Sequence, residues 1–331
     1  MLAYARKYEW LIKANSPWSP INGCIYRLNR LKTTVIRPYF MEVLQLKFEG
    51  SLSEFDMIQV FQIIETYIFR RSICDIPTNA LNKIFLLLHK DIMRLDGSAS
   101  HYPAKLKWVL LNKIGNGRFP DDKEFSDMLS TRNIYSMKRE SKFYLFERIE
   151  NADTLETKDV WAHLDARRYT IEHIMPQKLT ANWKNDLGND YERIHSSWLH
   201  RLANLTLTAY NAEYFNHPFI VKRDTENGYG ESGIRLNQWI ARLDEWGEAE
   251  LENRNNVLIE RAVKVWPFIE TNYEPAQKQY RAATLDDEID FTGQIITKYA
   301  FMGIEQSATS WADMYTQVLI QLYAMVNLNS M

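Results

Sequence analysis

Helical spacing of apolar residues dominates the first half of the chain. Residues 55–69 are apolar around most of the circumference that a helix would present, which indicates a buried helix. Arg70 and Arg71 follow directly, and basic side chains are favourable near a helix C-terminus. Further helices are expected over residues 2–13, 36–48, 80–93, 103–113, 122–129 and 137–150. The pattern predicts a helical region over residues 1–150.

The hydrophobic pattern changes after a polar connection at residues 151–158. Residues 169–171 and 205–207 are short segments of β-branched, aromatic or apolar residues, too short for helices and typical of strands. Residues 211–223 have helical spacing with a break near residues 216–218. The fold class expected from this order is mainly α with a small β component.

Helical spacing returns over residues 234–266, and residues 271–284 have the composition of a linker. A last helix is expected over residues 311–326. The 331 residues are enough for two or three domains. The expected division is a helical region at 1–150, a second domain at 151–270, and a linker with a partial C-terminal module at 271–331.

Composition limits the classes of protein that fit the chain. Hydrophobic residues make up 46% and charged residues 25%, which are ordinary values for a globular protein. No apolar run reaches the ~18 residues of a membrane span, and charges within the N-terminal apolar stretch argue against a secretory signal. Cys24 and Cys74 form no CxxC pair, so we expect a reduced cytoplasmic protein without a structural zinc cluster. With a net charge of −2, any contact with DNA requires a local basic patch.

The window of residues 167–223 carries the candidate chemistry. An acidic-His pair, Glu172 and His173, ends the first expected strand. Asn204 belongs to the second expected strand, and Asn211 starts the helix that follows. This order is the HNH pattern, which builds a one-metal nuclease site within a ββα core, here embedded in helices. Four of the chain's seven histidines lie in the window: His173, His195, His200 and His217.

Hydrolysis of a phosphodiester requires an activated water and neutralisation of the charge on the phosphate. Adjacent strand residues point to opposite faces, so Glu172 and His173 can take these two roles separately. His173 is the expected catalytic base, and Asn204 is expected to brace the loop after it. Glu172 and Asn211 are the expected metal ligands, because carboxylate and amide oxygens suit Mg²⁺ or Mn²⁺.

Lys222 and Arg223 are candidates for contacts with DNA phosphates, and a solvated position is the alternative for both. The window holds eight Lys/Arg against five Asp/Glu, which permits contact with DNA without being diagnostic of it. No HExxH or CxxC motif supports a zinc hydrolase, and no GxxxxGK[ST] loop supports nucleotide binding of that kind.

Other residues of the window keep a second interpretation. Asn211 can be the N-cap of its helix, which does not exclude metal ligation. His217 is the substitute if Asn211 is not a ligand. His195 and His200 flank Trp198 on an expected helix, and packing or a surface position is expected for both.

These residues resemble the C-terminal nuclease domain of the GmrSD family of modification-dependent (type IV) restriction enzymes. The resemblance covers residues 50–270 and is most specific over residues 171–222. Ala203 stands where the family usually has Gly. The matching segments include EHIMPQ at 172–177, LANLTL at 202–207, Asn211, Asn216, Phe219 and Lys222.

The resemblance implies a metal-dependent endonuclease of an anti-phage system that cleaves double-stranded DNA with modified bases or a modified backbone. In the family, an N-terminal ParB-like domain hydrolyses nucleotide and senses the modified DNA. Nothing in this sequence resembles that sensor domain. We therefore expect the chain to be a fragment, a truncated homologue or one subunit of a split system. The sensor domain would then act in cis or in trans. A homo-oligomer is left open, and no membrane partner is expected.

Two other functions compete with the nuclease. The first is a non-catalytic DNA-binding or regulatory module on a degenerate HNH fold. The second is an all-helical scaffold protein, which would explain residues 1–150 but not the window at 167–223.

Overall fold

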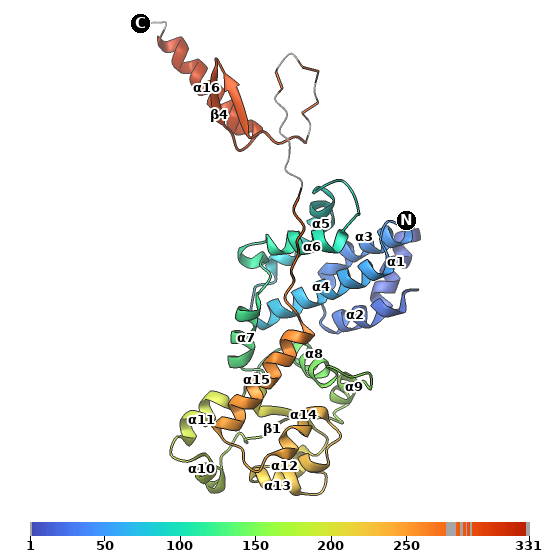
Figure 1. Cartoon of the computed structure of the whole chain (residues 1–331), viewed down its shortest axis with the longest axis vertical. Coiled ribbons are helices and arrows are strands. Elements are labelled where there is room, and N and C mark those ends of the chain that lie inside the picture. The colour runs from blue at the N-terminus through green and yellow to red at the C-terminus, as the bar shows by residue number, and fades with distance from the viewer. Residues whose placement is uncertain (1, 276–282, 285–286, 289, 292, 329–331) are drawn as a thin grey trace. The chain divides into compact units, whose positions relative to one another are not determined.

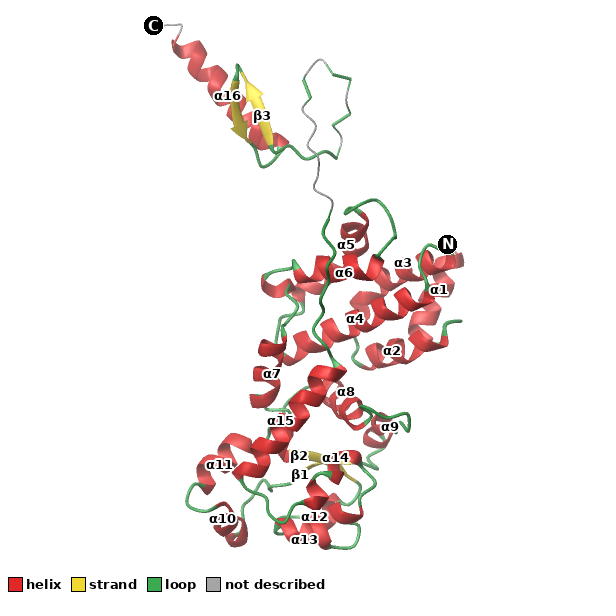
Figure 2. Cartoon of the chain, in the orientation of Figure 1, coloured by secondary structure: helices red, strands yellow, loops and turns green. Residues whose placement is uncertain are grey.

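The computed structural model describes residues 2–275, 283–284, 287–288, 290–291 and 293–328. Contacts divide the chain into two compact units, Met1–Ala276 and Gln277–Met331. Over the described residues 59% of the structure is helix and 5% is strand, in two small two-stranded sheets (Figure 2). The expected class, mainly α with a small β component, is confirmed. No described helix is long and apolar enough to span a membrane.

Helices build the N-terminal part of the first unit (Figure 1). The long helix α4 begins after the N-cap Ser53, whose hydroxyl accepts a hydrogen bond from the Asp56 backbone N–H. Helix α2 was not expected, although Ile21, Ile25 and Leu28 are buried at helical spacing. The helices are α1 (Leu2–Lys13), α2 (Ser19–Arg30), α3 (Arg37–Phe48), α4 (Glu54–Ile73), α5 (Asn79–Met93), α6 (Tyr102–Leu111), α7 (Asp122–Thr131) and α8 (Arg139–Glu150).

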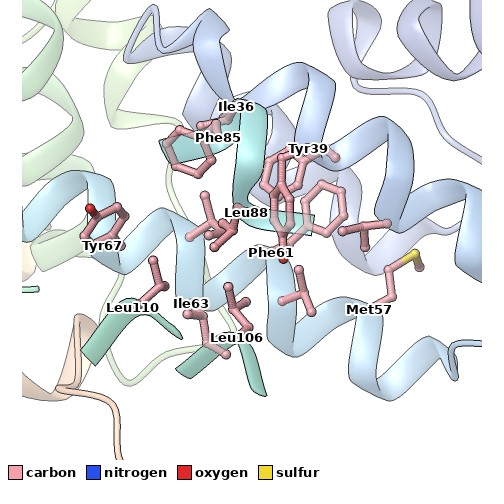
Figure 3. Packing of buried hydrophobic residues seen from close by; sticks show 14 of the residues in the cluster. Ile36, Tyr39, Met57, Phe61, Ile63, Tyr67, Phe85, Leu88, Leu106 and Leu110 are labelled. Carbon is pink, nitrogen blue, oxygen red and sulfur yellow. The ribbon is translucent and has the colours of Figure 1, made fainter. Parts of the chain in front are cut away.

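A first hydrophobic core fills the space between α4 and the helices around it. Phe40 of α3 stacks on Phe61 of α4 with ring centroids 3.9 Å apart. Tyr39 lies beside Phe40, with ring centroids 5.9 Å apart, and 6.2 Å from Phe85 of α5. Figure 3 shows Tyr39 near Phe61, and Leu106 and Leu110 of α6 near α4. The apolar circumference expected for residues 55–69 is therefore explained by contact with helices on several sides.

A second core joins the helical part to the strands and to α15 (Glu248–Val265). Trp266 packs on Phe69 of α4 with ring centroids 4.3 Å apart, and its Nε1–H donates to the Tyr144 hydroxyl at 2.9 Å. Arg70 Nε donates to the Trp266 carbonyl oxygen at 2.7 Å. Because of this core, the parts expected at 1–150 and 151–270 lie in the same compact unit, Met1–Ala276.

Two short strands carry the candidate site. β1 (Thr170–His173) pairs antiparallel with β2 (Leu205–Thr208), in a register that sets Glu172 opposite Thr206 and His173 opposite Leu205. Asn204 lies in a single 3₁₀ turn, η3 (Leu202–Asn204), just before β2 rather than within the strand as expected. The surrounding helices are α9 (Val160–Asp165), α10 (Ala181–Leu187), α11 (Tyr191–Trp198), α12 (Asn211–Tyr214), α13 (Phe219–Asp224) and α14 (Arg235–Gln238).

The second unit contains a hairpin followed by a helix. β3 (Lys298–Phe301) pairs antiparallel with β4 (Ile304–Ser307), and this hairpin was not expected. The helix expected over 311–326 is present as α16 (Trp311–Leu328). Of the linker expected at 271–284, residues 276–282 lie outside the described residues.

Candidate functional site

The two adjacent residues of the acidic-His pair enter different surroundings. Glu172 Oε1 lies 2.6 Å from Lys222 Nζ of α13. The His173 ring lies 4.6 Å, between centroids, from the ring of Tyr135, which belongs to the connection between α7 and α8. This separation follows from the alternation of side chains along β1.

Lys222 is fully buried, and its ammonium makes three hydrogen bonds. It donates to Glu172 Oε1 at 2.6 Å, to the His173 carbonyl oxygen at 2.9 Å and to the Ile174 carbonyl oxygen at 3.1 Å. An ammonium has three donors, so all of them are used inside the domain. This corrects both expectations for Lys222, since the side chain is neither solvated nor placed on a surface that DNA could reach.

Burial acts on both members of the Glu172–Lys222 pair. It raises the pKa of the Glu172 carboxyl, and the nearby Lys222 charge opposes that shift. It lowers the pKa of the Lys222 ammonium, and Glu172 opposes that shift in turn. Each charge therefore depends on its partner, as in other desolvated ion pairs.

Asn211 lies at the start of α12, on the same face of β1 as Glu172. Its Nδ2 donates to the Thr170 hydroxyl at 3.1 Å, and Thr170 precedes Glu172 by two strand positions. The N-cap of α12 is Tyr210, so Asn211 is not a capping residue. No described residue donates a hydrogen bond to Asn211 Oδ1, which leaves this oxygen as an acceptor.

The donor set on this face fits a hard divalent cation only in part. Glu172 and Asn211 provide oxygen ligands of the kind that Mg²⁺ takes together with water and phosphate. No group of three or more His, Cys, Asp or Glu side chains able to hold a metal occurs among the described residues. Lys222 competes for one oxygen of Glu172, so a cation there would share this carboxylate with an ammonium.

His173 is buried on the opposite face of β1. Its Nε2 lies 3.0 Å from His200 Nδ1, and its Nδ1 lies 3.5 Å from Gln177 Nε2. Burial lowers the pKa of His173 to about 3, followed by the repulsion that His200 would exert if both rings carried a proton. The imidazole is therefore neutral near neutral pH.

Contacts of His173 that sequence reasoning missed come from several segments. His200, expected to pack or to face solvent, contacts the His173 ring directly, and Tyr135 stacks on His200 with 14° between the ring planes. Lys142 of α8 donates to the Tyr135 carbonyl oxygen at 2.6 Å. Tyr135 and Lys142 lie 38 and 31 positions before His173 in the sequence, and no motif marks them.

Asn204 is fully buried and joins two loops. Its Oδ1 accepts from the Met175 backbone N–H at 2.8 Å. Its Nδ2 donates to the Met175 carbonyl oxygen at 2.9 Å and to the Leu199 carbonyl oxygen at 3.0 Å. The loop after His173 is thus hydrogen-bonded to the segment before β2. His195 adds a contact of its Nε2 with the Pro176 carbonyl oxygen at 3.0 Å.

The remaining candidates lie away from these contacts. The Arg223 guanidinium binds Asp224 Oδ1 at 2.6 Å and Asp244 Oδ1 at 2.7 Å, and both aspartates raise the pKa of Arg223. Its charge is therefore already paired within the domain. Among the described residues His217 makes backbone hydrogen bonds only: its carbonyl oxygen accepts from Trp183 Nε1 at 2.9 Å, and its N–H donates to the Tyr214 carbonyl oxygen at 3.1 Å.

Comparison with known proteins agrees with this part of the chain. Residues 119–261 match the family model described as GmrSD restriction endonucleases, C-terminal domain. The match includes all the candidate site residues, and it also includes Tyr135 and Lys142. No curated protein matches the chain. A restriction endonuclease domain indicates a nuclease with DNA as its substrate, and residues 119–261 belong to the family of GmrSD C-terminal domains.

Proposed function

We propose that this domain is an HNH endonuclease that hydrolyses phosphodiester bonds of DNA with a divalent metal, Mg²⁺ or Mn²⁺. The observation that supports this proposal is the placement of the candidate base and the candidate metal ligands on opposite faces of β1. A neutral imidazole, His173, lies on one face, and two oxygen donors, Glu172 and Asn211, lie on the other. General-base chemistry and charge neutralisation would then act from opposite sides of one strand.

His173 would take the proton of the attacking water, because its imidazole is neutral and can accept one. A pKa of about 3 makes it a weak base in the DNA-free protein. A phosphate brought beside the ring would raise that pKa, since a nearby negative charge favours the imidazolium. Asn204 would hold the loop after His173 in place through its two bonds to Met175.

Glu172 and Asn211 would hold the metal. When bound, the metal would neutralise charge on the phosphate and polarise its oxygens. Lys222 holds the Glu172 carboxyl in place through the 2.6 Å contact, and its charge favours the ionised form that a metal would bind.

By family membership, the domain would be the effector of an anti-phage restriction system directed at DNA with a modified base or a modified backbone. A sensor domain in cis or in trans would then select the DNA. Cleavage should therefore be compared between plain plasmid and plasmid carrying either modification, with the chain alone. Equal cleavage of the plain plasmid and the two modified plasmids would mean that the modification is recognised outside this chain.

A second function is supported by the Glu172–Lys222 pair. If Lys222 is the permanent counter-ion of Glu172, the domain binds DNA or regulates a partner without cleaving. Titration of the full chain with Mn²⁺, followed by electron paramagnetic resonance, separates the two functions. Binding that is lost in Asn211→Ala favours the nuclease, and no binding favours the non-catalytic module.

The decisive experiment is plasmid nicking by the full chain with Mg²⁺, Mn²⁺ and no metal. We expect His173→Ala to reduce the rate by roughly 10²- to 10⁴-fold, as for loss of a general base. Ser196→Ala is the matched control, because this exposed side chain of α11 hydrogen-bonds, within the described part of the chain, only to the Arg193 carbonyl oxygen. Absence of cleavage with every metal, or unchanged cleavage by His173→Ala, contradicts the proposal.

A further inference from the structure

The His173 ring has a hydrogen-bond partner at each of its two nitrogens. Gln177 Nε2 lies 3.5 Å from Nδ1, and His200 Nδ1 lies 3.0 Å from Nε2. A side-chain amide nitrogen can only donate, so His173 Nδ1 carries a lone pair and no proton in this arrangement. The proton of the neutral ring is then on Nε2, and this N–H donates a hydrogen bond to His200 Nδ1.

We infer that His200 is a positioning residue that fixes the tautomer of His173, with the proton on Nε2 and the basic lone pair on Nδ1. This inference rests on the proposed function, in which His173 is the base. The tautomer of a histidine is set by the hydrogen bond that its other nitrogen makes. A base with the wrong tautomer presents an N–H to the water and cannot take its proton.

Aromatic contacts surround the pair of histidine rings. Tyr135 stacks on the His200 ring with 5.5 Å between centroids, and the same Tyr135 ring contacts His173. The two histidine rings meet at 70°, with His173 Nε2 and His200 Nδ1 at a hydrogen-bond distance of 3.0 Å. Gln177, the partner of His173 Nδ1, makes a weaker contact than His200 does. Its distance of 3.5 Å is long for a hydrogen bond, so an incoming water can replace it. The weakly held nitrogen is thus the one available for chemistry.

The chain offers a matched pair of substitutions at position 200. Asparagine places Oδ1 at the same side-chain level as His Nδ1, so His200→Asn keeps an acceptor for the His173 Nε2–H. Leucine has nearly the same shape as asparagine but no acceptor. Both variants lose the stack of Tyr135 on the His200 ring, so the difference between them isolates the hydrogen bond. Position 200 is half-buried, which allows either side chain to be accommodated.

The direct readout is the tautomer, measured by long-range ¹H–¹⁵N correlation of the full chain with ¹⁵N-labelled histidine. Assignment of the His173 signals comes from their loss in His173→Gln. Wild type and His200→Asn should show a protonated Nε2 and an unprotonated Nδ1. His200→Leu should show a mixture of both tautomers. Gln177→Glu is expected to shift the ring toward Nδ1–H, because its carboxylate accepts where the amide donates.

Plasmid cleavage is the second readout. We expect His200→Leu to reduce it roughly 10- to 100-fold, the usual effect of losing an orienting partner, and His200→Asn to restore most of it. A wild-type His173 with its proton on Nδ1, or equal tautomers in His200→Leu and His200→Asn, overturns the inference. Wild type with the expected tautomer but no cleavage contradicts the nuclease and leaves the tautomer assignment standing, so the two failures are distinguishable.

Discussion

Lys222 Nζ and Glu172 Oε1 lie 2.6 Å apart inside the domain, with 0% of the lysine side chain and 7% of the glutamate side chain exposed. The pair links α13 to β1, and the same ammonium also holds the carbonyl oxygens of His173 and Ile174. The end of the strand that carries the candidate base is therefore hydrogen-bonded to a charge on α13.

Lys222→Met should reduce the free energy of unfolding by about 3 to 5 kcal/mol, because it leaves the Glu172 charge buried without its partner. The double variant Lys222→Met with Glu172→Gln should recover part of that loss, since no uncompensated charge remains. Urea unfolding at pH 7 measures both. If the free energy of unfolding of Lys222→Met alone lies within about 1 kcal/mol of the wild-type value, Glu172 is already neutral or reaches water.

Stability should depend on pH through His173. Its pKa is lowered from 6.5 to about 3, so the unfolded chain binds its proton at a higher pH than the folded chain. This contribution to stability is fully present above pH 6.5 and is lost as the pH falls toward 3. Between pH 7 and pH 5, wild type should lose roughly 2 kcal/mol more than His173→Gln in urea unfolding. If the free energy of unfolding changes with pH equally in wild type and His173→Gln, the pKa of His173 is not lowered by folding.

Asn204→Asp tests the bond between the two loops. The carboxylate keeps the acceptor for the Met175 N–H but cannot donate to the Met175 and Leu199 carbonyl oxygens. With these acceptors and a buried charge left unpaired, we expect a loss of about 3 kcal/mol or more in the free energy of unfolding. Thermal unfolding measures it, and an unchanged midpoint would show that the loop is held by other contacts.

Trp266→Ala tests the coupling of the helical part to the strands. Trp266 is buried between Phe69, Phe125 and Tyr144, and its removal should cost about 3 to 5 kcal/mol. Because this core contains residues from both parts, we expect one cooperative transition in wild type by tryptophan fluorescence and by circular dichroism. Two separate transitions would show that the parts fold independently. Trp311→Ala in the second unit is the control.

Much of the architecture follows from local sequence. The apolar spacing of residues 55–69 and 80–93 predicted α4 and α5, and short β-branched segments predicted β1 and β2 within a few residues. Helix α2 escaped prediction because Pro20 and Gly23 weaken its local signal, while burial of Ile21, Ile25 and Leu28 stabilises it. The hairpin of β3 and β4 carries exposed residues at many positions, so little alternation marked it.

The sequence by itself determined the family of residues 119–261, the mainly helical class and the order of Glu172, His173, Asn204 and Asn211, because motif spacing and hydrophobic periodicity are local properties. Only the tertiary structure decided what these side chains contact. It turned Lys222 inward to Glu172 and brought His200 to His173 across 27 positions of sequence. Such contacts depend on which residues are desolvated together once the chain has packed, and no local pattern records that.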